Sequence, residues 1–96
     1  MRRCYLVCYD ISDQKRWRRI FRAMKGYGEH WQYSIFFCVL KEIDRVRMQS
    51  ELEMELNLKA DQCIIIDLGA DEQSARDAVA VLGESLPTAQ TGVVVV

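Results

Sequence analysis

The fold is decided by the stretch RCYLVCYDISDQKRWRRIFRAMKGYG, which is residues 3–28. Residues 3–9 are mostly apolar or aromatic and are followed by polar residues from Asp10 onward, which indicates a largely buried strand. Residues 13–27 then change to helical spacing, because large apolar side chains recur every three or four positions on one face. These side chains are Trp17, Ile20, Phe21 and Met24. The stretch therefore predicts a buried strand followed directly by an amphipathic helix.

The segments that follow complete the order of elements. Residues 30–40 are strand-like again, but they exceed the usual length of a strand and are polar in the middle, so we expect two strands, near 29–32 and 34–40. A second helix is predicted over 42–57 and another strand over 63–68. The order β-α-β-β-α-β predicts an α+β fold, the ferredoxin-like plait, with both helices on one face of an antiparallel sheet.

The predicted helix at 42–57 carries two apolar stripes. One stripe holds Ile43, Val46 and Met54, and the other holds Met48, Leu52 and Leu56. A helix that lies on a sheet buries a single stripe, so we expect the second to contact another chain. The helical spacing of the methionines, Met54 included, also favours core positions for them.

The whole chain, 1–96, is predicted to form one domain, with a plait core at 1–70 and a C-terminal extension at 71–96. The extension holds a possible short helical segment at 71–83 and ends in GVVVV at 92–96. Four valines will not stay exposed, and so short a strand cannot fold alone, so it must extend its own sheet or that of a partner. These features predict a homodimer.

Charge is distributed unevenly along the chain. The net charge is −1, yet the first fifty residues carry eleven Lys or Arg against five Asp or Glu, and the remaining residues carry two against nine. This asymmetry favours a polyanionic partner on one side of the molecule. The chain has no apolar run of membrane-spanning length, and its N-terminal apolar run stops at Asp10. We therefore expect a cytoplasmic protein without a membrane segment.

The four cysteines lie in separate apolar runs and form no Cys-x-x-Cys pair. They are Cys4, Cys8, Cys38 and Cys63. A zinc site needs clustered ligands, and only His30 is available to join them. We interpret the cysteines as buried free thiols.

The first predicted helix is strongly basic, and no acidic residue lies between residues 14 and 28. Arrays of this kind bind phosphate backbones, although a charged helix face is often merely solvated. The density of charge favours contact with nucleic acid. The candidate contacts are Lys15, Arg16, Arg18, Arg19, Arg22 and Lys25.

Aromatic residues gather in the middle of the chain, at Trp31, Tyr33, Phe36 and Phe37. Aromatic side chains on a ferredoxin-like sheet can stack on bases, but this run lacks the glycine and basic residues of the RNA-recognition signature. Packing in the core or against a second chain is the favoured interpretation.

Asp10 follows the first strand, at a position where functional side chains become accessible. The alternative is a structural role, in which Asp10 caps or turns the chain into the helix; Ser12 or Asp13 can also cap that helix. Magnesium binds oxygen ligands, usually one or two carboxylates with waters and substrate phosphates. One Asp10 is a poor site, whereas two that meet across a two-fold axis make an adequate one.

Taken together, these motifs resemble the small universal CRISPR adaptation protein family, the partner of the adaptation integrase. The resemblance lies in the Tyr-Asp-Ile at 9–11, the arginine-rich helix and the segment GEHWQYSIF at 28–36. The Asp-Leu-Gly at 67–69 and the valine-rich end are similar as well. Members often carry Glu or Gln where this chain has Phe37, which weakens the expectation of a rich catalytic site.

The resemblance implies a homodimer with facing sheets, in which the C-terminal strand extends the sheet of the partner. It implies binding of DNA or RNA, a scaffold role beside the integrase in spacer acquisition and, as in some members, a metal-dependent endonuclease. Carried onto this chain, the motif aspartate is Asp10, which would act as a catalytic magnesium ligand, one from each protomer. Possible supporting residues are Tyr9, Ser12, Ser34 and Phe36.

Two other functions stay open. One is a toxin-like ribonuclease of similar fold that uses the same Asp10 without an integrase. The other is a non-enzymatic ferredoxin-like assembly or sensing domain, against which the basic helix argues. Whether the chain cleaves nucleic acid, and whether it takes RNA or DNA, also stays open.

Overall fold

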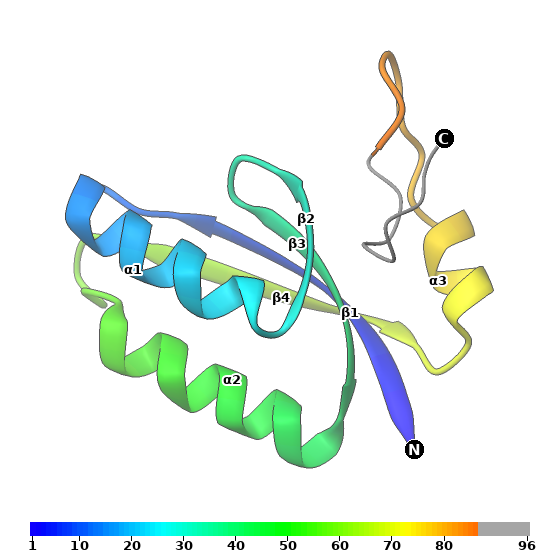
Figure 1. Ribbon diagram of the computed structural model, residues 1–96, viewed down its shortest axis with the longest axis horizontal. Coiled ribbons are helices and arrows are strands. Elements are labelled where there is room, and N and C mark those ends of the chain that lie inside the picture. The colour runs from blue at the N-terminus through cyan, green and yellow to red at the C-terminus, as the bar shows by residue number, and fades with distance from the viewer. Residues whose placement is uncertain (87–96) are drawn as a thin grey trace.

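The computed structural model describes residues 1–86 and contains four strands and three helices in that range (Figure 1). In chain order they are β1 (Arg2–Asp10), α1 (Gln14–Lys25), β2 (Gly28–Gln32), β3 (Ile35–Lys41), α2 (Glu42–Glu55), β4 (Gln62–Gly69) and α3 (Glu72–Asp77). The first six confirm the predicted β-α-β-β-α-β order. The predicted terminal strand at 92–96 lies outside the described residues.

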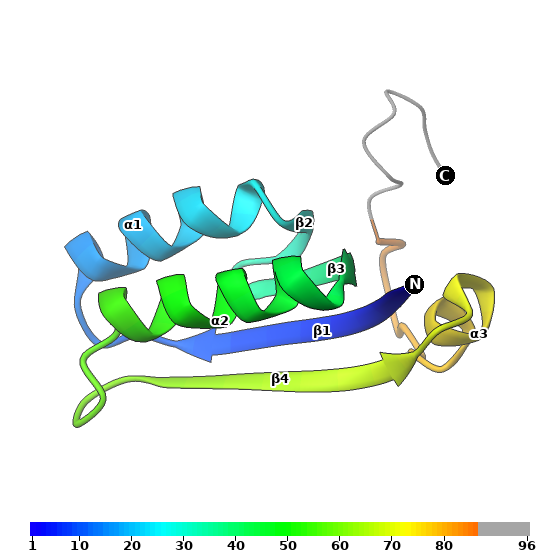
Figure 2. The same ribbon diagram turned by 90° about the horizontal axis from the view of Figure 1, so that it is seen from below.

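The strands form one antiparallel sheet in the order β2-β3-β1-β4. Both α1 and α2 cover the same face of this sheet, as Figure 2 shows. This is the arrangement of the ferredoxin-like plait. Gly28 opens β2 close to β3, where an added Cβ would lie 2.5 Å from the carbonyl oxygen of Phe37. The close approach of the two strands therefore requires glycine at this position.

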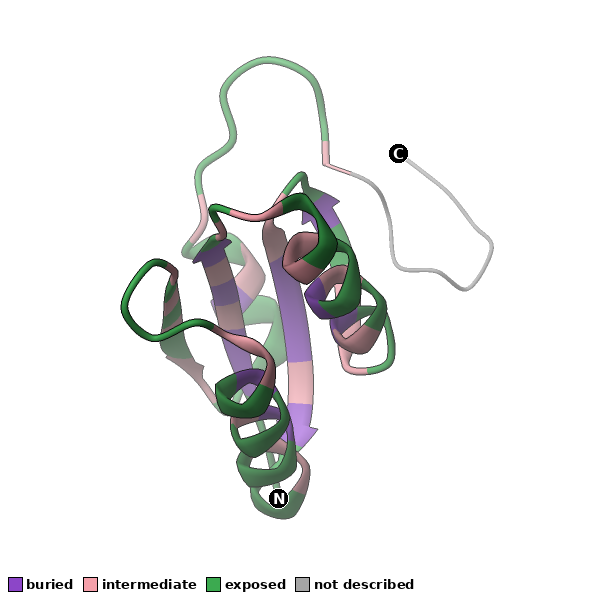
Figure 3. Cartoon of the chain, turned by 90° about the vertical axis from the view of Figure 1, so that its left-hand side faces the viewer, coloured by how far each residue is buried: buried purple, intermediate pink, exposed green. Residues whose placement is uncertain are grey.

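The main core lies between the sheet and the two long helices. Alternate residues of β1 (Tyr5, Val7, Tyr9) face the helices, as the period of a strand dictates. They pack with Ile20 and Met24 of α1 and with Met48 and Leu52 of α2. Figure 3 shows buried positions along the strands and exposed ones along the outer sides of the helices. The predicted core stripe of α1 is confirmed, and of the two stripes of α2 the one with Met48 and Leu52 faces the sheet.

The stripe of α2 that holds Ile43, Val46 and Met54 is solvent-exposed in the single chain. The exposed fractions are 63% for Ile43, 48% for Val46 and 85% for Met54. The expectation that Met54 belongs to the core is therefore wrong, because Met48 and Leu52 already fill the side of α2 that faces the sheet. The helix offers its other stripe to solvent.

The opposite face of the sheet is covered only in part. Phe37 is buried there, stacks on Trp31 at a centroid distance of 4.9 Å, and lies beneath the guanidinium of Arg76 at 4.5 Å. Arg76 belongs to α3 and pairs with Glu29 at 2.7 Å. Phe37 therefore helps to dock α3 on the sheet. No segment of residues 1–86 covers the β4 side of this face, where Ile64 and Ile66 are exposed.

All four cysteines are free; Cys4 and Cys38 are buried, and Cys8 and Cys63 are half-buried. Burial raises the pKa of the Cys38 thiol to about 12. Within residues 1–86, no group of three or more His, Cys, Asp or Glu side chains is placed to hold a metal ion. No helix in that range is both long and apolar enough to span a membrane.

Candidate functional site

Asp10 ends β1 at the rim of an open hollow of about 340 Å³. The hollow lies where the end of β1 meets α1 and the turn between β2 and β3. Among residues 1–86, the Asp10 carboxylate is exposed and has no side-chain hydrogen bond or ion pair. The lining consists of Tyr9, Asp10, Ile11, Trp17, Gln32, Tyr33, Ser34 and Ile35. Asp10 is thus the only acidic side chain among the described residues that line this hollow, and it is available to a ligand.

The cap of α1 is Asp13, not Asp10. The Asp13 carboxylate accepts a hydrogen bond from the backbone N–H of Arg16 at 2.9 Å, which is the geometry of an N-cap. This bond lowers the pKa of the Asp13 carboxyl. The capping alternative for Asp10 therefore loses its structural basis, because another residue satisfies the first turn of the helix.

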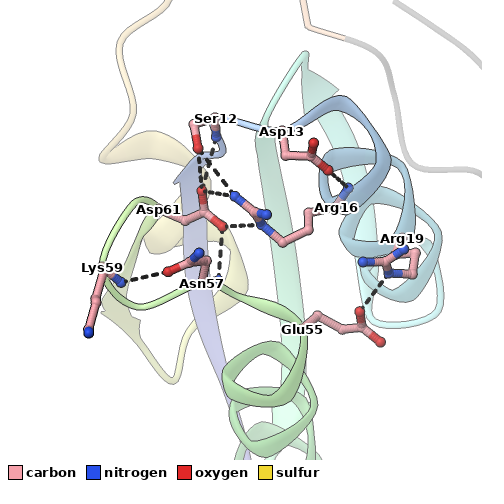
Figure 4. Close-up of polar contacts among 8 residues, drawn as sticks. All are labelled: Ser12, Asp13, Arg16, Arg19, Glu55, Asn57, Lys59 and Asp61. Carbon is pink, nitrogen blue, oxygen red and sulfur yellow. Dashed lines mark hydrogen bonds and ion pairs between the residues drawn. The ribbon is translucent and has the colours of Figure 1, made fainter.

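The loop between Asp10 and α1 is anchored by Asp61, which follows α2 (Figure 4). Asp61 accepts hydrogen bonds from the backbone N–H and the hydroxyl of Ser12, at 3.0 and 3.1 Å. It also accepts from the guanidinium of Arg16, at 2.8 and 3.1 Å, and from the backbone N–H of Asn57 at 3.0 Å. The Asp61 side chain is fully covered. These bonds hold the pKa of the Asp61 carboxyl well below its usual range, the Arg16 guanidinium having the largest effect.

The six cations of α1 divide into two groups. Arg16 is paired with Asp61, and Arg19 is paired with Glu55 at 2.9 Å (Figure 4). The others lie three, four and three residues apart, which places them in one stripe along the helix. This cationic stripe consists of Lys15, Arg18, Arg22 and Lys25, all exposed. None of the four forms an ion pair within residues 1–86.

The wall of the hollow is built from α1 and the turn between β2 and β3. The indole N–H of Trp17 donates a hydrogen bond to the hydroxyl of Ser34 at 2.9 Å, and the backbone N–H of Tyr9 donates to the carbonyl of Ser34 at 3.1 Å. Tyr33 stacks on Trp17 with ring centroids 4.6 Å apart. Ser34 therefore has a structural role beside Asp10, because it links the end of β1 to α1.

Two of the supporting residues lie in the core. Phe36 is fully buried, and Tyr9 is stacked on it with ring centroids 6.3 Å apart. The Tyr9 hydroxyl is buried without a hydrogen-bond partner in the described part of the chain. Desolvation raises the pKa of Tyr9, so the phenol stays protonated.

A magnesium ion in this hollow would have few protein ligands. One protomer offers the single carboxylate of Asp10, with the side-chain amide of Gln32 among the other oxygen-bearing groups of the lining. Magnesium commonly binds to one or two carboxylates and completes its shell with water and phosphate. The donor set therefore fits an ion shared between two protomers better than an ion held by one.

Two residues that help to build the Asp10 site, Asp61 and Tyr33, were not predicted from the sequence. Asp61 lies in the turn NLKAD, where nothing in the local pattern distinguishes an anchoring carboxylate from a solvated one. Tyr33 belongs to the aromatic run that is expected to pack in the core or against a second chain, but it is 67% exposed in the single chain and is therefore not a core residue. Its place in a polar break between two strands was the available signal. For Trp31, Phe36 and Phe37 the packing interpretation is confirmed.

Comparison with known proteins identifies close relatives. The family model described as CRISPR associated protein Cas2 matches residues 2–76. The chain is 43% identical to CRISPR-associated endoribonuclease Cas2 1 of Rhodospirillum rubrum, over 88% of this chain and 81% of that protein. It is 39% identical to endoribonuclease Cas2 2 of Thermodesulfovibrio yellowstonii, over 91% and 92% of the two chains.

Solved structures agree with these matches. A protein of Thermus thermophilus described as hypothetical superposes with a TM-score of 0.77 at 30% identity, covering 94% of this chain and all of that one. Cas2 of Streptococcus pyogenes superposes with a TM-score of 0.73 at 27% identity, covering 83% and 99%. The likeness thus extends over nearly the whole described fold.

Proposed function

The chain belongs to the Cas2 family of CRISPR associated proteins, and from this we propose that it binds nucleic acid in CRISPR adaptation and hydrolyses a phosphodiester at Asp10. The observation that carries the proposal is the exposed Asp10 carboxylate, which has no partner in residues 1–86. The hollow of Asp10 is lined in part by Trp17 of α1. The same helix carries the cationic stripe, a row of cations of the kind that binds phosphates. The relatives from Rhodospirillum and Thermodesulfovibrio, named endoribonucleases, support the same chemistry.

The proposed active form is a homodimer in the cytoplasm. Ile64 and Ile66 expose an apolar surface on the open face of the sheet, and their strand, β4, is an edge strand. Edge strands accept additional strands readily. The valine-rich segment at 92–96, which is outside the described residues, is proposed to extend the β4 edge of the partner. Such a dimer would bring the two Asp10 hollows into one assembly.

In this dimer, the Asp10 carboxylates of the two protomers would hold a magnesium ion. When bound, the ion lowers the pKa of a nearby water and stabilises the charge that develops on the phosphate. The residues of the chain itself have separate tasks. The cationic stripe binds the phosphates of the substrate, and Asp61 holds the loop that follows Asp10. Trp17 and Ser34 keep the facing wall of the hollow in place.

The accompanying role is to hold DNA beside the adaptation integrase. Two stripes on one dimer would provide two separated rows of phosphate contacts, which suits a duplex scaffold. A toxin-like ribonuclease would use the same Asp10 and the same stripe. An adaptation integrase gene next to the gene for this chain would favour the scaffold role, and the absence of one would favour the ribonuclease.

The test is to incubate the purified protein with single-stranded RNA and with duplex DNA, each in magnesium and in EDTA. Magnesium-dependent cleavage that is lost in Asp10→Asn supports the hydrolytic part. Binding without cleavage limits the function to a scaffold. The absence of both binding and cleavage contradicts the proposal.

A further inference from the structure

The Asp10 hollow has an exposed aromatic ring on its wall that the packing of the fold does not explain. Tyr33 is 67% exposed, although the three aromatic residues nearest to it in sequence, Trp31, Phe36 and Phe37, are buried. Its one aromatic contact within residues 1–86 is with Trp17. Because that contact covers a single face of the ring, so large an exposed fraction requires the other face to be open to solvent.

The ring beneath Tyr33 is held by contacts on several sides. Trp17 stacks on Tyr33 at 4.6 Å and 18°, and it stacks in turn on Phe21 at 5.0 Å and 13°. The indole N–H of Trp17 is held by Ser34 at 2.9 Å. Phe21 also makes an edge contact with His30 at 4.9 Å. The open ring is thus the outermost member of a row of nearly parallel rings.

This row of rings begins on the helix that carries the cationic stripe. The ammonium of Lys25 lies 5.4 Å from the centroid of Phe21, and Phe21 and Trp17 are both residues of α1. At the other end, Tyr33 and Asp10 line the same hollow of about 340 Å³. This volume is within the range of small-ligand pockets, roughly 300–1,000 Å³. An exposed aromatic ring and the candidate acid therefore line one hollow, and the helix that supports the ring also carries the cationic stripe.

From this arrangement we propose that Tyr33 is a stacking platform for one unpaired nucleobase of the strand bound at Asp10. The inference rests on the proposed function and adds to it a preference for nucleic acid that is single-stranded at the site. Proteins that hold single strands combine a cationic groove with aromatic rings on which bases stack. A base within a duplex has both faces covered by its neighbours and must be unstacked before it reaches such a ring, which is unfavourable.

The platform explains why Tyr33 sits on the surface. The face of Tyr33 that is turned to water makes no packing contact for the fold, whereas base stacking on a preformed ring requires little ordering of the protein. Because every base has a π face, the platform selects for an unpaired base and not for one sequence. Tyr33 therefore favours single strands over duplexes, while the cationic stripe contributes affinity to both.

The experiment measures binding in EDTA, so that cleavage does not enter. The probes are a short single-stranded RNA with one 2-aminopurine and the duplex of the same sequence. Tyr33→Ala should weaken binding of the single strand roughly 5- to 150-fold, the effect of losing one stacked base. Duplex binding should be unchanged. Quenching of 2-aminopurine by the parent should be lost in Tyr33→Ala.

Two variants separate stacking from other causes. Tyr33→Phe keeps the ring and should bind and quench like the parent. Tyr33→Leu keeps an apolar side chain without a π face and should fail to quench. Thermal unfolding of each variant verifies that the exposed substitution leaves the fold intact.

Equal binding of the single strand by parent and Tyr33→Ala would overturn the inference and leave the proposed function standing. An equal loss on single strand and duplex would overturn it too, since the ring would then be acting through the fold. A parent protein that binds neither probe would overturn the proposed function and this inference together.

Discussion

The carboxylate of Asp61 and the guanidinium of Arg16 form two hydrogen bonds, at 2.8 and 3.1 Å, between residues 45 positions apart in sequence. This pair connects the turn after α2 to the first turn of α1. Because Asp61 also accepts both hydrogen-bond donors of Ser12, the loop directly after Asp10 is held at the same point. The position of the candidate acid therefore depends on a carboxylate from a distant part of the chain.

Asp61→Asn should destabilise the protein by about 2 kcal/mol, because it removes charge-assisted hydrogen bonds from a fully covered group. The free energy of unfolding in denaturant measures the loss. The matched control is Glu55→Gln, which breaks an ion pair whose partners are 50% and 36% exposed. That loss should stay below about 1 kcal/mol. Equal effects of the two substitutions would contradict the anchoring role of Asp61.

The same carboxylate should make stability depend on pH in the acid range. Its folded pKa lies below the ordinary value of about 3.9, so its contribution is present above that value and is lost as pH falls toward the folded pKa. Below about pH 4 the unfolding free energy of the parent should therefore fall more steeply than that of Asp61→Asn. Asp13, Asp67 and Asp71 also have lowered pKa values and contribute equally to both proteins. Parallel acid curves would contradict this prediction.

The division of the cations in α1 should be visible in the salt dependence of DNA binding. Each phosphate contact contributes about 0.9 to the slope of log affinity against log salt. Arg18→Ala combined with Arg22→Ala should therefore reduce the magnitude of the slope by roughly two. Arg16→Ala should lower thermal stability and leave the slope as it is, because Arg16 is paired with Asp61. A slope that changes in Arg16→Ala and not in the double variant would place the binding face elsewhere.

Much of this fold could be predicted from residues 3–28, because a buried strand and an amphipathic helix have distinct periods. The core stripe of α1 followed from the same reasoning, whereas the sequence left open which of the two stripes of α2 faces the sheet. The Asp61 anchor could not be predicted, since it joins two loops that only the tertiary fold brings together. The roles of Arg16 and Arg18 could not be separated either, because their identical charge conceals which one has a nearby acid. Tyr33 is aromatic like its buried neighbours, and only its place in the polar break between two strands sets it apart in the sequence.

Dimerisation should depend on the face of the sheet that exposes Ile64 and Ile66. Ile66→Glu places a charge on an apolar surface beside β1 and should weaken the proposed dimer while leaving the main core intact. Deleting residues 91–96 should weaken it as well. Sedimentation over a range of concentrations measures both effects. The control is Met54→Glu, an equally charged change on the exposed stripe of α2. A dimer that resists the two sheet-directed changes but is lost in Met54→Glu would place the interface on α2.

Asp10→Asn decides between nuclease and scaffold. The substitution keeps the size of the side chain and removes the charge that would hold a cation. Cleavage in magnesium should be abolished, whereas dimerisation and affinity for DNA should stay near those of the parent, since the cationic stripe supplies the binding. Affinity should rise if it changes, because negative charge is removed near phosphates. Electrophoresis of labelled substrates and binding titrations measure the two effects separately.

The matched control for this substitution is Asp13→Asn. Asp13 is the N-cap of α1, and asparagine caps a helix about as well as aspartate does, so stability should be nearly unchanged and cleavage retained. The two aspartates lie three residues apart and undergo the same chemical change, but Asp10 lines the hollow and Asp13 does not. Cleavage that continues at the parent rate in Asp10→Asn would refute the metal-site assignment. Equal losses in both variants would show that the loop, and not the Asp10 carboxylate, had been disturbed. If neither the parent nor Asp10→Asn cleaves and both bind DNA, the scaffold role stands alone, because the hollow then holds an acid that the protein does not use for hydrolysis.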